Sequence, residues 1–266
     1  MLKRFFHPEL CELYEARQFS RLISRCEELL QEKRVEFGEQ HPELESALYD
    51  MANAYMYVGN YQSSLKATLE LLSIVPSEPD DRRANRVLYL NNLGMLHHRF
   101  QHPQEAEAIL CQALELVDTL PQEFQWNRPT IQINLARFHD DRKEFKEAER
   151  LLVDAARQRA KLFGWGHCMF GDVFISFSVL YANQGKLIAA ERAVQKSLRI
   201  YRKRMETEGP EYAVALNLLG DLKRKQGSQQ EAAASYQAAL EILERVRPAD
   251  HPDIKKVRQQ LTRIQA

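Results

Sequence analysis

The chain has 266 residues, of which 44% are hydrophobic and 28% charged, a composition that indicates a packed core and argues against disorder. Its 37 basic residues balance its 37 acidic residues, which excludes a net field drawing the whole molecule onto nucleic acid or an acidic membrane. There is no apolar run long enough to cross a membrane, and the opening stretch MLKRFFHPEL lacks the apolar core of a signal peptide.

Amphipathic helical patterns, paired by short turns, follow one another along the chain. The clearest pair lies at 91–116, where large apolar residues recur at helical spacing on both sides of a turn at 101–103. We expect about thirteen helices in one domain over 1–266. In chain order these form a degenerate hairpin at 8–35, hairpins at about 42–76, 84–118, 128–160, 168–205 and 210–246, and a capping helix at 251–265.

Two sets of small residues recur every 42 residues with no slippage. The first set is Ala52, Gly94, Ala136, Ser178 and Gly220. The second set is Ser64, Ala106, Ala148, Ala190 and Ala232. A fixed period of this length is typical of stacked helical hairpins, in which small residues let the two backbones approach closely.

This spacing of small residues resembles that of tetratricopeptide repeats, and the 42-residue period resembles the long variant found in kinesin light chains. The stretches that carry the resemblance are FGEQHPELESALYDMANAY, NNLGMLHHRFQ and LNLLGDLKRKQG. The resemblance implies an all-α fold, a right-handed superhelical solenoid of stacked antiparallel helix hairpins with a C-terminal capping helix. A HEAT array is the rival fold, but it does not require two small residues per hairpin in strict register.

Several residues depart from the repeat pattern or recur within it. His97, His139 and Lys223 stand where the repeat usually has an aromatic residue, and no heptad region precedes the repeats as in kinesin light chains. A motor-adaptor role is therefore not implied. Three histidines share one register of the 42-residue period, and we expect them to act at the starts of helices. They are His41, His167 and His251.

The inner face of such a superhelix is lined by the first helix of each hairpin. Packing within the hairpin occupies positions three, four, seven, eight, ten and eleven of that helix, so we expect five other positions to face the groove. The candidate peptide-binding residues drawn from these positions are Asp50, Asn53, Asn91, Asn92, Met95, Arg99, Ile133, Asn134, Arg137, Asp141, Ile175, Val179, Asn183, Asn217, Leu218 and Asp221.

Two amides and two arginines give this groove a polar character. Asn92 and Asn134 share one position on neighbouring hairpins, where asparagine in related repeats bonds the backbone of an extended ligand. An amide suits this role because it both donates and accepts. Arg99 and Arg137 lie nearby and favour a peptide with an acidic group.

An apolar strip beside these amides indicates an anchor pocket for the peptide. None of its side chains has a packing role inside its own hairpin. They are Ile133, Ile175, Val179 and Leu218. The alternative is that a chain terminus or a second copy of the protein covers the strip.

A cluster of histidines and aspartates is the candidate for a metal or catalytic site. It comprises His97, His98, His139, Asp140 and Asp141. Buried or boundary histidines are the simpler interpretation, because two of them replace a buried ring of the repeat. The basic run at 223–225 has no interleaved aromatics and is interpreted as a solvated face.

The cysteines indicate the compartment. They follow neither disulfide nor metal-ligand spacing, which favours a reducing environment, and we expect a cytoplasmic protein. Cys111 is expected on an apolar helix face, as a small hydrophobe. The four positions are Cys11, Cys26, Cys111 and Cys168.

The leading hypothesis is a non-enzymatic module that binds a peptide segment of a partner protein in its groove, with no cofactor, no metal, no nucleic acid and no membrane. The first alternative is a regulatory receptor in which a signalling peptide controls a bound effector. The second is a metal-dependent enzyme that uses His97 and His139. The oligomeric state is open, and a homodimer fits the pattern.

Overall fold

The computed structural model describes residues 7–75, 79–164, 167, 169–204 and 206–265. Trp165 and Cys168 lie outside these residues. The chain forms two compact units, residues 1–127 and 128–266, and we describe each by itself. One continuous solenoid over 1–266 therefore stays a prediction. Within the described ranges, no helix has both the length and the apolar character needed to span a membrane.

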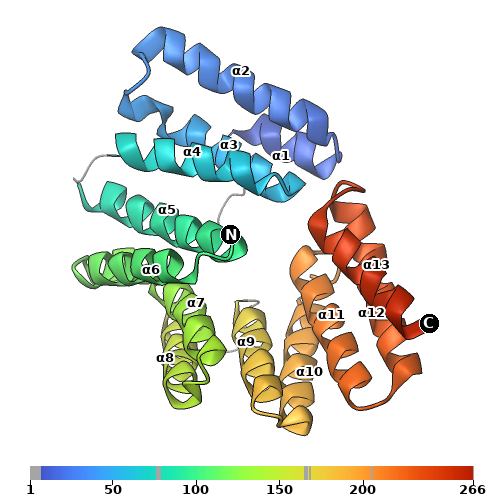
Figure 1. The fold of residues 1–266 in the computed structure, drawn as a ribbon. Helices are drawn as coiled ribbons and strands as arrows, with labels where there is room; N and C mark the ends of the chain where they lie inside the picture. The colour runs from blue at the N-terminus through green and yellow to red at the C-terminus, as the bar shows by residue number, and fades with distance from the viewer. Residues whose placement is uncertain (1–6, 76–78, 165–166, 168, 205, 266) are drawn as a thin grey trace. The chain divides into compact units, whose positions relative to one another are not determined.

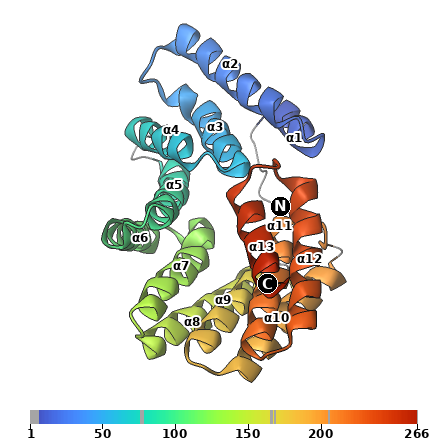
Figure 2. The ribbon, with the colours of Figure 1, turned by 45° about the vertical axis from the view of Figure 1, so that its right-hand side comes forward.

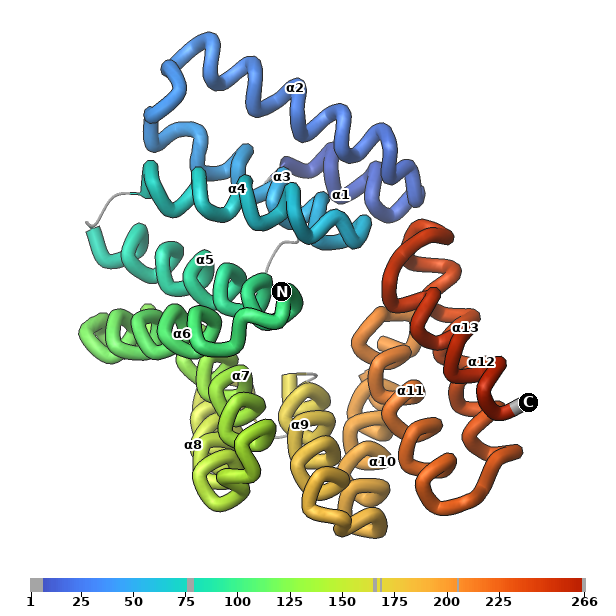
Figure 3. The backbone as a smooth tube through the Cα atoms, in the orientation of Figure 1, coloured from blue at the N-terminus to red at the C-terminus, as the bar shows by residue number. Residues whose placement is uncertain are grey.

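Unit 1 contains three helical hairpins (Figure 1). Short 3-10 segments lie between the first and second hairpins and after the third. The elements are α1 (Pro8–Glu15), α2 (Phe19–Phe37), η1 (Pro42–Leu44), α3 (Glu45–Val58), α4 (Tyr61–Ile74), α5 (Asp80–Arg99), α6 (Pro103–Asp118) and η2 (Gln122–Asn127). The tube in Figure 3 traces α3 with α4 and α5 with α6 as neighbouring antiparallel pairs.

Unit 2 contains three more hairpins and a final helix (Figure 2). They are α7 (Arg128–Asp141), α8 (Phe145–Phe163), α9 (Phe170–Asn183), α10 (Leu187–Lys203), α11 (Pro210–Lys225), α12 (Gln229–Val246) and α13 (Pro252–Gln265). The described residues thus form thirteen α-helices and no strand, as predicted from the sequence.

The small residues of the two registers meet where the helices of a hairpin cross. Ser64 Oγ donates to the carbonyl of Ala52 over 2.9 Å, and Ser178 Oγ donates to the carbonyl of Ala190 over 2.8 Å. Each bond therefore joins a member of one register to a member of the other, across the hairpin. Both serine side chains are buried, so the bonds also satisfy hydroxyls that water cannot reach.

A glycine occupies the first register where the partner side chain is large. A Cβ on Gly94 would lie 2.8 Å from Leu110 Cγ, and a Cβ on Gly220 would lie 2.6 Å from the ring of Tyr236. Real Cβ atoms essentially never approach so closely. The close approach of α5 to α6 and of α11 to α12 therefore depends on the missing side chain.

Three histidines in one register act at helix starts, as predicted. The backbone N–H of Glu43 donates to His41 Nδ1 over 3.3 Å, and that of Asp253 donates to His251 Nδ1 over 3.1 Å. His167 Nδ1 accepts the N–H two residues further on in the same way. These bonds satisfy N–H groups that a helix start leaves without an intrahelical partner.

The final helix α13 packs against α12 and covers the last hairpin. Its Ile254 and Val257 are buried in a core shared with Tyr236, Leu240 and Leu243 of α12. The predicted capping role of this helix is consistent with these contacts.

One sequence interpretation about a side chain is wrong. Cys111 is exposed, although we expected it on the apolar face of its helix. The buried stripe of α6 runs through Ala106, Leu110 and Val117. Cys111 follows Leu110 by one residue, which rotates its side chain about 100° around the helix and away from that stripe.

Candidate functional site

A pocket opens in unit 2 between the first helices of two neighbouring hairpins, α7 and α9. The second helix of the first hairpin, α8, closes its base. Its empty space, including the part open to solvent, is about 350 Å³. The lining residues are Ile133, Ala136, Arg137 and Asp140 from α7, Ala148 and Leu152 from α8, and Ile175, Ser176, Val179 and Leu180 from α9.

Three of the four residues of the predicted apolar strip line this pocket: Ile133, Ile175 and Val179. Ala136 and Ala148, one from each small-residue register, also line it, and their lack of bulk leaves room between the hairpins. Leu218 is absent from the described lining and packs instead against the core formed by α10 to α13. Three of the four predicted strip residues therefore share one pocket, and Leu218 on α11 lies outside its lining.

The charged residues of the pocket lining are Asp140 and Arg137. Asp140 is only 5% exposed, and its Oδ2 accepts a hydrogen bond from Asn183 Nδ2 over 2.7 Å. Burial raises the pKa of the Asp140 carboxyl, the bond from Asn183 opposes that rise, and the neighbouring charge of Asp141 adds to it. Arg137 is exposed.

Sequence reasoning selected Asp141 for the groove, whereas the pocket is lined by Asp140. Asp141 is exposed. The two residues differ by one position, about 100° around the helix, and this rotation decides which carboxyl lies in the pocket. The lining residue Leu180 was missed because its position was assigned to packing within the hairpin, and Ser176, at a groove-facing position, was left out of the candidate residues.

Several predicted groove residues are buried, whereas groove positions were expected to have no packing role. Asp50, Asn91, Ile133 and Asn134 are at most 9% exposed. For Asp50 the reason is visible: its Oδ2 accepts the backbone N–H of His7 over 3.0 Å, so a segment outside the repeats covers it. The residues in the intermediate class are Asn53, Asn92, Met95, Ile175, Val179, Asn217, Leu218 and Asp221, and the exposed ones are Arg99, Arg137, Asp141 and Asn183.

Arg99 and Asp221 bond side chains within their own unit. Arg99 donates to the hydroxyl of Tyr61 over 2.9 Å and lies over its ring at 4.3 Å. Asp221 accepts from the hydroxyl of Tyr236 over 2.7 Å and from Gln260 of the capping helix. Asp221 therefore ties α11 to α12 and α13.

The candidate residues are divided between the two compact units. The candidates in unit 1 are Asp50, Asn53, Asn91, Asn92, Met95 and Arg99, and the others belong to unit 2. The pairing of Asn92 with Asn134 therefore stays a prediction. The pocket is assembled from unit 2 alone.

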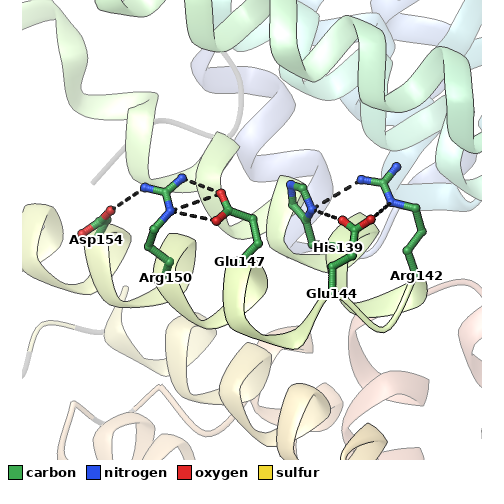
Figure 4. Close-up of polar contacts among 6 residues, drawn as sticks. All are labelled: His139, Arg142, Glu144, Glu147, Arg150 and Asp154. Atoms are coloured by element: carbon green, nitrogen blue, oxygen red, sulfur yellow. Dashed lines mark hydrogen bonds and ion pairs between the residues drawn. The ribbon is translucent and has the colours of Figure 1, made fainter.

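His139, half of the candidate metal pair, takes part in a surface ion-pair network (Figure 4). Its Nδ1 lies 2.6 Å from Glu144 Oε2, and this contact lowers the pKa of the glutamate. Arg142 contacts the same carboxylate, and Arg150 bonds Glu147 further along α8. Across the described residues, no three His, Cys, Asp or Glu side chains gather as metal ligands.

The basic run at 223–225 is partly neutralised by acidic neighbours. Lys223 Nζ, on α11, lies 2.9 Å from Glu191 Oε1 of α10 and 2.9 Å from Glu231 Oε2 of α12, so its side chain contacts two other helices. Its bonds to Glu231 and Glu191 raise the pKa of the ammonium group. At the position where the repeat usually has an aromatic residue, Lys223 therefore forms ion pairs with its own hairpin and with the preceding one.

Stacked antiparallel hairpins with small residues at their crossings, and a pocket between successive first helices, define the class of helical-repeat proteins. The sequence profile of the tetratricopeptide repeat family matches residues 43–118 and 177–245, and a second profile of that family matches residues 130–167. The chain belongs to the tetratricopeptide repeat family. Among curated proteins, no sequence matches the chain.

Solved structures of other repeat proteins share this fold. BtubC (BKLC) from P. vanneervenii is 19% identical, with a TM-score of 0.60 over 86% of this chain and 90% of that chain. A putative kinesin light chain from Podosopora anserina, with nearly identical TPR-like repeats, is 20% identical, with a TM-score of 0.51 over 76% of this chain and 96% of that chain. The apo form of RapI is 15% identical, with a TM-score of 0.63 over 91% and 97% of the two chains.

Proposed function

We propose that the protein is a non-enzymatic interaction module that binds a peptide segment of a partner protein, and that the pocket between α7 and α9 receives the anchor side chain. Repeat proteins of this kind use the surface formed by successive hairpins to bind other proteins. The observation that supports the proposal is the pocket itself, which is lined by Ile133, Ile175 and Val179.

The chemistry of the pocket suits a peptide better than a catalytic reaction. Apolar walls with a few converging polar groups are the usual form of a ligand-binding site. The walls come from two adjacent hairpins, so an extended segment lying across them would place one side chain in the pocket. Arg137 at the same place would pair with an acidic residue of that segment.

The proposal is tested by probing purified protein with an array of random nonapeptides and measuring dissociation constants of the best binders by fluorescence anisotropy. Val179→Glu introduces a charge among apolar walls and should weaken binding at least tenfold. Asn134→Ala should lower stability, because the side chain is buried, and should change the dissociation constant little, because Asn134 does not line the pocket.

The matched control is Ile188→Glu, which makes the same kind of change on α10 at a residue that is 68% exposed. It should leave the dissociation constant within twofold of the wild-type value. Circular dichroism melts of all variants separate lost binding from lost folding. If Ile188→Glu weakens binding while folded Val179→Glu binds normally, the outer surface holds the peptide and the proposal is wrong.

The receptor alternative predicts a different result when the same peptides are bound. A signalling peptide would change the affinity for a second protein, whereas a simple module would bind one segment and transmit nothing.

A further inference from the structure

Asp140 has one carboxylate oxygen that the fold does not satisfy. Its Oδ2 accepts from Asn183, but within the described part of the chain no donor lies within hydrogen-bonding reach of Oδ1, although that atom is buried. A buried acceptor without a partner costs free energy, more so when the group is charged. Asp140 lines the pocket, so a small turn of its carboxylate would present this oxygen to a donor on a ligand there.

The rest of the pocket limits what that donor can be attached to. The large apolar side chains of the lining are aliphatic and include Ile133, Leu152, Ile175 and Val179. A group that fits both features has an aliphatic stem of several carbons and a donor at its tip. Lysine and arginine side chains have this form: their stems pack on apolar surface while the charged end reaches a polar partner.

We propose that the anchor of the bound peptide is a lysine or arginine, whose stem lies against the aliphatic walls and whose cationic end donates to Asp140 Oδ1. This inference rests on the proposed peptide-binding function. It assigns Asp140 as the residue that determines specificity and Asn183 as the residue that positions its carboxylate.

The other charges near the pocket do not reverse this preference. Arg137 is the like charge that would oppose a cation, but it is exposed, so water and salt screen its effect. Asp141, exposed beside Asp140, adds attraction. Asp140 is buried, so its interaction with a cation is screened least. Burial also raises the pKa of Asp140, and a bound cation would oppose that rise by favouring the ionised form.

The test uses the full chain and three sets of N-acetylated, C-amidated nonapeptides. The central residue is fixed as lysine, norleucine or glutamate, and the flanking positions are randomised. Norleucine keeps the lysine stem and lacks the amine, so the pair isolates the bond to Asp140. We expect the wild-type protein to retain the lysine set about tenfold more strongly than the norleucine set, and the glutamate set least.

Asp140→Asn keeps the shape of the side chain and removes its charge. It should reduce retention of the lysine set to that of the norleucine set. Val179→Glu should weaken retention of the norleucine set, and Ile188→Glu should change neither set. Wild-type protein that retains norleucine peptides as well as lysine peptides overturns this inference alone, even if Asp140→Asn fails to fold. Equal retention of every set by wild-type and Val179→Glu protein overturns the proposed function as well.

Discussion

Gly220 offers a sharp test of the hairpin geometry, because an added methyl group has two opposite effects there. The residue lies inside α11, where glycine is about 1 kcal/mol less favourable than alanine. By helix propensity alone, Gly220→Ala should therefore stabilise the protein. The structure predicts the reverse, because the new Cβ would lie 2.6 Å from two ring carbons of Tyr236.

The Tyr236 ring has little freedom to move away. Its side chain is fully buried, and its hydroxyl donates to Asp221 Oδ1 over 2.7 Å. Forcing a methyl group into such a core costs about 1–3 kcal/mol, and the fixed ring places this site in the upper part of that range. After the gain in helix propensity, we expect a net loss of about 1–2 kcal/mol, or roughly 2–8 °C in melting temperature.

The assay is urea unfolding followed by circular dichroism, in a double-mutant cycle with Tyr236→Leu. A leucine side chain can rotate its end away from the new methyl group, so Gly220→Ala should cost little or become stabilising in that background. The coupling between the two sites should be at least about 1 kcal/mol. A Gly220→Ala protein that is more stable than wild type, with no coupling to Tyr236, would refute the close approach of α11 and α12.

Three further predictions follow from the packing. Ala148→Leu should cost about 1–3 kcal/mol in urea unfolding, because Ala148 is fully buried at a helix crossing; an unchanged midpoint would contradict the register. Deleting residues 251–266 should expose the face of α12 around Tyr236 and cause self-association in light scattering, whereas a stable monomer would argue against the cap. Burial raises the pKa of Cys26 to about 12, so a thiol reagent should label exposed Cys111 quickly and Cys26 only on unfolding.

The hairpins could be predicted because the residues that specify them lie close together in the chain and recur at a fixed period. Small residues at Ala52 and Ser64, or at Ser178 and Ala190, lie twelve positions apart in the chain and are joined by a hydrogen bond in the fold. A period that recurs without slippage specifies which helices pair and where they cross. Helix starts were equally accessible, since a histidine two residues before its bonding partner is a short-range pattern.

The site was less predictable because it depends on rotation about a helix axis and on distant partners. A difference of one residue, about 100°, separates Asp140 in the pocket from Asp141 outside it, and the same step separates buried Leu110 from exposed Cys111. The hydrogen bond that Asp140 Oδ2 accepts comes from Asn183, which lies on another hairpin. No repeat pattern indicates which of two adjacent side chains a neighbouring hairpin will cover.

The pocket between α7 and α9 has a consequence for how such a chain can change. Neither hairpin contains the pocket, because its walls come from α7 and α8 on one side and from α9 on the other. On the proposed function, a hairpin moved alone into another repeat array would keep its fold and lose its ligand preference. Ligand selectivity would then belong to pairs of neighbouring hairpins, and recombination of single repeats would create a new pocket at each new junction.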